Sequence, residues 1–270
     1  TIGTAIRPSP ESVPAGKGKF IKSGGGIRRG AWQNLSVSDG LIGDDVRTLA
    51  DPEGGVLWIG TYSGVSRYDG GSFVNFTTEE GLLNDRISAV YVDDQNRVWA
   101  GTDGGLSCYD GESFTNFTTE DGLINNSIWA IHEDAEGIMW IGTSDGLSRY
   151  DGETFRNFTT DDGLPQNFVV ALFTDRKGRL WVGTYGGLCW YDRNSFRNFT
   201  GDEGLPRDRV YAIAEDRNGF LWFGTWQSGV IRYDGRKFRN FTTQEGLSHN
   251  RVRAIGSDHN GHVWFGTNRG

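Results

Sequence analysis

Short apolar runs alternate with polar turns along most of this chain. In the stretch that begins at Gly81, the apolar runs cover residues 87–92, 97–102, 105–110 and 113–118, and Gly, Asp and Asn occupy the breaks. Runs of this length, rich in β-branched and aromatic residues, are typical of strands joined by tight turns. No segment keeps a 3.6-residue apolar period over three turns. The pattern therefore predicts an all-β fold.

One phrase recurs in every copy of this pattern: an apolar residue, Trp, a further apolar residue, Gly and Thr. The six tryptophans are spaced by 41 or 42 residues: Trp58, Trp99, Trp140, Trp181, Trp222 and Trp264. A fixed period of this length indicates one supersecondary unit copied along the chain. A residue found in every copy is expected to serve the fold, whereas a residue found in one copy is a better candidate for a site.

Four strands in about 40 residues form a unit of the size of a β-propeller blade. Blades stack face to face, which explains why the strands are apolar on both sides. The repeated Trp is then expected to fill the space between neighbouring blades, and the Gly-Thr after it keeps the strand end slim. Small residues recur on the predicted innermost strand, where blades converge: Thr48, Ala89, Ala130, Ala171, Ala212 and Ala254.

The two ends of the chain each carry half a unit. The last copy stops after its second predicted strand, and residues 31–36 align with residues 72–77 of an outermost strand. We therefore predict a six-bladed β-propeller with four-stranded antiparallel blades, its ring closed by N- and C-terminal strands that share one blade. The third strand of that blade lies either around residues 20–22 or around Ile27, which aligns with Tyr68, and the sequence leaves both open.

Residues 1–19 carry three of the six prolines together with glycine and lysine. This composition is typical of a flexible N-terminal tail or linker. The propeller is predicted over residues 20–270, with repeats that begin near residues 40, 81, 122, 163, 204 and 246.

The formal net charge of -8 argues against binding to nucleic acid or to an anionic membrane. No stretch of 18 apolar residues is present, so membrane insertion is not expected. The two cysteines, Cys108 and Cys189, fall at different positions of repeats two copies apart. We interpret both as buried small residues and not as a disulfide, because a disulfide needs Cα atoms within about 7 Å.

Residue types vary between copies in the loops before the first strand and after the second, which share one face of a propeller. There we predict a pocket with aromatic walls and arginine donors: Tyr62, Trp129, Tyr185, Tyr211, Trp226, Arg47, Arg86, Arg209, Arg251 and Arg253. Aromatic faces with planar donors suit a carbohydrate-like or acidic small ligand. The alternative is that these side chains only fill the channel or contact solvent.

An oxygen-bearing side chain occurs at one loop position of every copy: Asp44, Asp85, Asn126, Asn167, Asp208 and Asn250. We interpret it as a loop cap of the Asx-turn kind, with a ring of cation ligands as the alternative. Asn-Phe-Thr runs likewise match a glycosylation pattern at Asn75, Asn116, Asn157, Asn198 and Asn240. Because these too are repeat positions, we expect the asparagines to serve the blade edge.

Catalytic and metal-binding patterns are missing from the sequence, and no cofactor is expected. The four histidines, His132, His249, His259 and His262, have no metal-ligand spacing and no evident nucleophile beside them. Asp103 and Asp145 with His249 are the only loose catalytic candidates. We therefore do not expect an enzyme.

The repeat itself resembles a known family. Residues 204–242 contain the successive elements GLP, LWFGT, IRYDG and FRNFT, and this pattern resembles the two-component regulator propeller repeat over about residues 24–270. The resemblance implies a periplasmic or extracellular sensory propeller, like the ligand-sensing portions of bacterial hybrid histidine kinases. The leading hypothesis is a non-enzymatic ligand-binding propeller. The alternatives are a protein–protein interaction scaffold and a propeller enzyme such as a lyase or glycosidase.

Overall fold

The structure is a computed structural model that describes residues 6–10, 12–23, 27–29, 32–52, 55–199, 201–258 and 260–270. It divides into two compact units. The N-terminal unit contains Ile6–Ile131 and Glu153–Phe155, and the C-terminal unit contains His132–Gly152 and Arg156–Gly270. Among the described residues every helix is a three-residue 3₁₀ turn, and all other regular structure is β-strand. The all-β prediction is confirmed.

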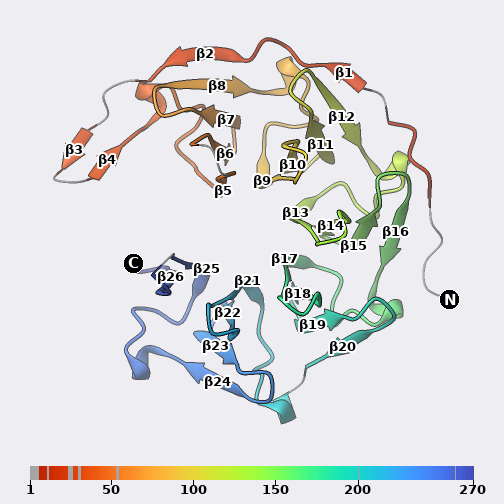
Figure 1. The fold of residues 1–270 in the computed structure, drawn as a ribbon, viewed down its shortest axis with the longest axis vertical. Helices are drawn as coiled ribbons and strands as arrows, with labels where there is room; N and C mark the ends of the chain where they lie inside the picture. Colours follow the sequence, from red (N-terminus) through yellow and green to blue (C-terminus); the bar gives the residue numbers. More distant parts are fainter. Residues whose placement is uncertain are drawn as a thin grey trace. The chain divides into compact units, whose positions relative to one another are not determined.

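The N-terminal unit holds two five-stranded sheets, in the orders β2-β8-β7-β6-β5 and β1-β12-β11-β10-β9 (Figure 1). The strands of the first are β2 (Lys19–Lys22), β5 (Thr48–Ala50), β6 (Leu57–Thr61), β7 (Gly64–Tyr68) and β8 (Ser72–Phe76). Those of the second are β1 (Ser12–Pro14), β9 (Ile87–Val92), β10 (Val98–Thr102), β11 (Leu106–Tyr109) and β12 (Ser113–Phe117). A separate hairpin pairs β3 (Ile27–Arg29) with β4 (Trp32–Asn34).

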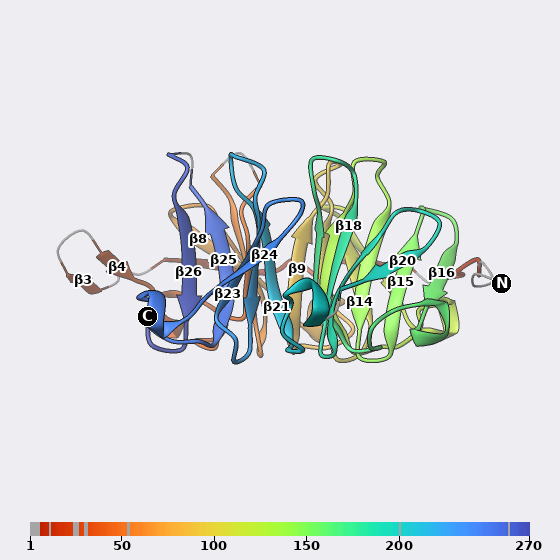
Figure 2. The ribbon, with the colours of Figure 1, turned by 90° about the horizontal axis from the view of Figure 1, so that it is seen from below.

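The C-terminal unit holds two four-stranded sheets and one two-stranded sheet (Figure 2). Its strands are β17 (Val169–Thr174), β18 (Leu180–Thr184), β19 (Gly187–Tyr191), β20 (Phe196–Asn198), β21 (Val210–Glu215), β22 (Leu221–Thr225), β23 (Val230–Tyr233), β24 (Phe238–Phe241), β25 (Val252–Ser257) and β26 (Val263–Thr267). The division between the units passes through a further four-stranded sheet of β13 (Ile128–Glu133), β14 (Met139–Thr143), β15 (Gly146–Tyr150) and β16 (Phe155–Phe158). The four-stranded antiparallel unit predicted from the repeat is confirmed.

Five of the six described 3₁₀ turns that follow an outermost strand carry a compact capping device. In the turn η2 (Thr78–Glu80), Thr77 and Glu80 form a reciprocal capping box, and Gly81 ends the turn with φ 116°. The same box recurs at the turns that begin at Val37, Thr119, Thr160 and Thr243. A left-handed φ at the closing position explains why each copy has Gly there.

Two sequence expectations for the N-terminal segment differ from the structure. Residues 12–14, expected in a flexible tail, form strand β1, which pairs with the outer strand β12. Residues 19–22, at the expected boundary between tail and propeller, form β2, which pairs with the outer strand β8. Of the two segments considered for the third strand of the incomplete blade, residues 27–29 pair with β4 and residues 19–22 pair with β8. The β3–β4 register places Arg29 opposite Trp32, whereas Tyr68 faces Phe73. The residue equivalent to Tyr68 is therefore Arg29 and not Ile27, because the β3–β4 hairpin is two residues shorter than the β7–β8 hairpin.

The repeated Trp packs between sheets, as predicted. In the N-terminal unit Trp58 contacts Phe76 of its own sheet and Tyr109 of the next, at 6.0 and 6.2 Å between ring centroids. In the C-terminal unit Trp181 is completely buried, and its ring lies 5.7 Å from Tyr233 of the following sheet. The sequence did not reveal a second constraint, which is a hydrogen bond from the indole N–H to an Asp six residues earlier, such as Trp181 to Asp175 at 2.8 Å. It is made by every repeated Trp except Trp58, where position 52 is Pro. The hairpin loop and the core are thus tied together.

Both cysteines are free and buried. Burial raises the pKa of Cys108 to about 12, and it also raises the pKa of Cys189. Neither thiol is therefore a ready nucleophile, in agreement with the sequence interpretation. In the described part of the chain, no helix is long and apolar enough to cross a membrane.

The buried His132 makes stability depend on pH. Burial lowers its pKa to about 4, and its Nε2 accepts a hydrogen bond from the Thr174 amide at 3.0 Å. In the unfolded chain the pKa of His132 is about 6.5, so the unfolded chain binds a proton at a higher pH than the folded chain does. The free energy of unfolding therefore falls as the pH falls from about 6.5 to about 4. We expect the parent to lose about 2 kcal/mol more than His132→Gln between about pH 7 and pH 5. Urea unfolding at both pH values measures this, and equal losses in both proteins would contradict it.

Candidate functional site

Six of the ten predicted site residues gather in the C-terminal unit. Local backbone hydrogen bonds place them, because the loop after each second strand bonds to the residue before the first strand. Tyr185 donates its amide to Phe168 at 3.0 Å, and Trp226 donates to Arg209 at 3.1 Å. Asn268 donates likewise to Arg251 at 3.2 Å. The two variable positions of each repeat are therefore brought side by side.

The aromatic side chains among these six residues form a row in which each ring contacts the next. Tyr185 lies 5.8 Å from Tyr211, and Tyr211 lies 5.6 Å from Trp226, measured between ring centroids. Phe168 stacks on Tyr185 at 4.2 Å. Phe168 was not among the predicted site residues, although it occupies the same variable position as Arg209 and Arg251. The residues form a continuous aromatic surface, which we call the Trp226 cluster: Phe168, Tyr185, Arg209, Tyr211, Trp226, Arg251 and Arg253.

Three arginines cover the aromatic faces of the Trp226 cluster. The guanidinium carbon of Arg251 lies 3.4 Å from the Trp226 ring centroid, and that of Arg253 lies 5.3 Å from it. Arg209 lies 4.3 Å from Tyr185 and 5.4 Å from Trp226. Cations over aromatic faces are attracted by the ring quadrupole.

The charges of these arginines are not neutralised locally. Within the described residues, none of Arg209, Arg251 and Arg253 forms an ion pair with a carboxylate. The Nε of Arg251 is buried and has no hydrogen-bond partner. A hydrogen bond with Tyr211 raises the pKa of Arg209, and burial together with Tyr211 raises the pKa of Tyr185 to about 12. The cluster is therefore positive at neutral pH in a protein whose net charge is negative.

The loop with one additional residue, 226–228, is held by Asp208. This carboxylate accepts hydrogen bonds from the backbone amides of Gln227 and Ser228 at 2.7 and 2.8 Å. It also accepts one from the backbone amide of Arg209 at 2.8 Å. Its counterparts in the other copies accept instead from an amide seven residues earlier, as Asn167 does from Thr160 at 2.8 Å. The fifth repeat thus uses its Asp to position Trp226.

The remaining predicted residues lie in the N-terminal unit or at its end. Arg47 and Arg86 lie 5.0 and 4.8 Å from the Tyr62 ring centroid, which makes a smaller group of the same chemistry. Arg86 differs from the arginines above because it pairs with Asp103 at 3.2 Å. Trp129 donates its indole N–H to Ser127 at 3.2 Å. A single pocket built from all ten residues stays a prediction.

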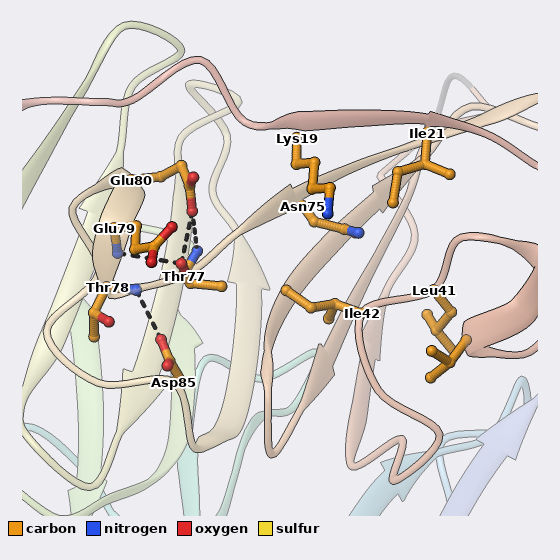
Figure 3. Close-up of a pocket in the computed structure, with 11 residues that line it drawn as sticks. Lys19, Ile21, Leu41, Ile42, Asn75, Thr77, Thr78, Glu79, Glu80 and Asp85 are labelled. Carbon is orange, nitrogen blue, oxygen red and sulfur yellow. Dashed lines mark hydrogen bonds between the residues drawn. The ribbon is translucent and has the colours of Figure 1, made fainter.

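A hollow of about 540 Å³ lies elsewhere in the N-terminal unit, between β2 and the turn η2 (Figure 3). Two of its three acidic side chains already serve the local structure, because Glu80 accepts from Thr77 at 2.8 Å and Asp85 accepts from Thr78 at 2.7 Å. These two carboxylates are capping groups of the turn η2, so we assign no ligand to this hollow.

The loop Asp and Asn residues cap local structure, as interpreted from the sequence, but not as Asx turns. Asp44, Asp85, Asn126 and Asn250 accept from the first amide of the preceding 3₁₀ turn, seven residues earlier, at 2.7–2.9 Å. No group of three metal-ligating side chains occurs among the described residues.

Three of the five asparagines of the Asn-Phe-Thr runs, Asn75, Asn116 and Asn157, form side-chain hydrogen bonds. Asn75 is buried, accepts from Ser66 at 2.6 Å and donates to the Gly40 carbonyl at 3.0 Å. Asn116 donates to the equivalent carbonyl of Gly81 at 3.1 Å.

Each of the loose catalytic candidates has its own local partner within its unit. Asp103 pairs with Arg86 in the N-terminal unit. In the C-terminal unit, Asp145 accepts a long bond from Asn167 at 3.4 Å, and His249 Nδ1 accepts from the Arg251 amide at 2.9 Å. His249 therefore orients the Trp226 cluster backbone, and His259 lies outside the described residues.

Comparison with known families identifies the same repeat. The two-component regulator propeller family matches residues 81–104, 122–145, 163–186, 204–227 and 246–269. These five segments are two-component regulator propeller repeats, and the resemblance seen in the sequence is confirmed. A search of curated proteins finds no match to the chain.

Solved structures share the fold. The extracellular domain of a proposed hybrid two-component system from B. thetaiotaomicron is 26% identical with a TM-score of 0.79, over 99% of this chain and 38% of that chain. A second extracellular domain from the same organism, of a proposed one-component system, is 21% identical with a TM-score of 0.69, over 100% and 39%. Virginiamycin B lyase from Staphylococcus aureus is 14% identical with a TM-score of 0.69, over 83% and 78%. The chain thus spans less than two fifths of the two extracellular domains.

Proposed function

We propose that this chain is a non-enzymatic sensory propeller that binds an acidic, carbohydrate-like small ligand at the Trp226 cluster. The observation that carries the proposal is the position of Arg251, which stacks on Trp226 while its buried Nε lacks a partner. A buried polar group without a hydrogen bond is costly, so an incoming acceptor gains the bond that the protein leaves unmade.

The chemistry of the cluster defines the ligand class. Indole and phenol faces pack against the apolar faces of sugar rings, while planar guanidinium groups bind carboxylates through two parallel hydrogen bonds. Arg209, Arg251 and Arg253 form no ion pair with a carboxylate in the described part of the chain, so an anionic ligand is favoured over a neutral one. The relatives that are extracellular domains of sensory systems support a periplasmic or extracellular location.

Calorimetric titration with a uronic-acid oligosaccharide and its neutral analogue of equal length tests the proposal. We expect tighter binding of the uronate, weakening at high salt, and a loss of about tenfold or more in Trp226→Ala and in Arg251→Met, because truncating one partner of a buried charged contact costs about 2 kcal/mol or more. Tyr62→Ala in the N-terminal unit is the matched control and should bind normally. Uronate binding that ignores both cluster substitutions would remove this site from consideration.

We also propose that β25–β26 and β3–β4 complete a sixth four-stranded blade and close the ring. The β3–β4 register puts Arg28 opposite Gln33, just as Arg67 lies opposite Val74. In complete sheets the residue at this place faces the repeated Trp, as Arg67 faces Trp58 and Arg232 faces Trp222. Arg28 therefore has the residue type expected opposite Trp264, whose side chain is 65% exposed.

Disulfide trapping tests the shared blade. The aligned register predicts that Ile27 faces Phe265, so the double variant Ile27→Cys with Phe265→Cys should form a disulfide within one chain on mild oxidation. Mass spectrometry and gel mobility at low protein concentration measure it. The pair Gln33→Cys with Phe265→Cys is the control, and crosslinks found only between chains would contradict closure.

A further inference from the structure

The N-terminal segment forms an outer strap, defined here as the described residues of 6–22, along the outermost strands of the N-terminal unit. Ile21 faces Phe73 of β8, and Val13 faces Phe114 of β12 (Figure 1). Ile6 forms an isolated bridge with Phe155, in which the two residues exchange amide hydrogen bonds of 2.5 and 2.6 Å. The strap therefore adds strands to the sheet edges from within the same chain, in the way that an extended peptide adds to a sheet edge.

The contacts of the strap recur once in each of three successive repeats. Its three anchors, Ile6, Val13 and Ile21, are all branched aliphatic residues and lie seven and eight residues apart, while the phenylalanines that they face lie 41 residues apart. Each anchor therefore meets the same position of a successive repeat. One rule of recognition, a branched aliphatic residue opposite the Phe of the outermost strand, is used three times.

The anchors occupy a notch formed by that Phe and the Gly that closes the preceding 3₁₀ turn. A methyl group added to Gly40 would lie 2.9 Å from Ile21 Cγ2 and 3.0 Å from Phe73 Cδ2. At Gly122 the same methyl would lie 2.9 Å from Ile6 Cγ2. Figure 3 shows Ile21 on β2, on the same side of the hollow as Leu41. The notch is thus filled by Ile21 at Gly40 and by Ile6 at Gly122.

In two repeats of the C-terminal unit, the same notch is not entered by any residue that the structure describes. Phe196 of β20 faces Tyr191, and Phe238 of β24 faces Tyr233, the register that Phe73 keeps with Tyr68. Their notch glycines are Gly163 and Gly204, whose nearest neighbours are Phe196 and Phe238 themselves. No described strand pairs with the outer edge of β20 or β24.

Burial separates the filled notches from the open ones. The strap-covered phenylalanines Phe73, Phe114 and Phe155 are 0%, 3% and 0% exposed. Phe196 and Phe238 are only half-buried. Their amides point to the free edge, because Phe155 at the equivalent place uses its amide to bind Ile6. An open edge with an apolar notch is a template for another strand.

We propose that the outer edges of β20 and β24 bind an extended peptide segment whose branched aliphatic residues recur every seven or eight positions. The charges next to the anchors indicate a further property of the bound peptide. Arg7, directly after the anchor Ile6, pairs with Glu153, two residues before β16, at 3.7 Å, and the equivalent place two residues before β24 is taken by Arg236. The segment on β24 therefore carries an acidic residue directly after its anchor.

A synthetic peptide with the sequence of residues 4–16 is the probe, because it holds Ile6 and Val13 at the required spacing. A second peptide carries Arg7→Glu. Fluorescence anisotropy measures binding to the intact chain, and amide hydrogen exchange locates it. We expect saturable binding, protection of β20 and β24, and about threefold preference for the Glu peptide, since exposed ion pairs are weak. The exposed Arg236→Glu variant should reverse that preference.

A peptide in which both anchors are replaced by aspartate is the control and should not bind. Three results would overturn the proposal: no saturable binding, equal binding of the anchorless peptide, or protection confined to β8 and β12, which would mean exchange with the resident strap. Because the Trp226 cluster is not involved, the uronate titration above is expected to be unaffected by either peptide.

Discussion

Replacement of Trp181 by alanine is expected to lower the free energy of unfolding by about 3–5 kcal/mol. The side chain is completely buried, and its ring lies 5.4 Å from Phe199 and 5.3 Å from Phe223. Truncation therefore opens a cavity between two sheets. It also removes the donor that binds Asp175 at 2.8 Å, which leaves a nearly buried carboxylate with one partner fewer.

Urea unfolding followed by circular dichroism measures this loss. Phe20→Ala is the matched control, because Phe20 is also aromatic and lies in a strand but is 68% exposed. Its cost should stay within about 0.5 kcal/mol. A Trp181→Ala protein that loses no more than Phe20→Ala would mean that the repeated Trp does not hold neighbouring sheets together.

The second large effect is expected at the glycine two residues after that Trp. A Cβ added at Gly183 would lie 2.6 Å from the Val210 carbonyl oxygen and 3.0 Å from the Ala171 Cβ. The first contact is with backbone, so no side-chain rotation relieves it. We expect Gly183→Val to cost about 3 kcal/mol or more, because overpacking displaces the neighbouring inner strand.

Gly256 offers the control for this substitution. It too lies within a strand, β25, but a Cβ added there meets nothing within 4 Å. Gly256→Ala should leave stability unchanged or raise it by up to about 1 kcal/mol through the unfolded state. Comparable losses in Gly183→Val and Gly256→Ala would refute the close approach of the inner strands.

The composition of the site could be predicted from the sequence because the repeats supply their own reference. Positions that are constant in every copy serve the sheets, as Asn75 does, and positions that vary mark Trp226 and Arg251. What could not be predicted is the pairing. Arg86 and Arg251 are equivalent in the pattern, yet Arg86 pairs with Asp103 while Arg251 stacks on Trp226 with its Nε unbonded.

The sequence by itself determined the all-β fold, the four-stranded unit and the turn glycines, because these follow from apolar period and local turn chemistry. Only the tertiary structure decided the role of the outer strap. A Pro-containing segment such as Ser12–Pro14 has no strand pattern of its own, and it becomes a strand because β12 offers an unpaired edge. The same distinction separates the residues of the Trp226 cluster, visible in the chain, from their uncompensated charge, which depends on neighbours brought together by folding.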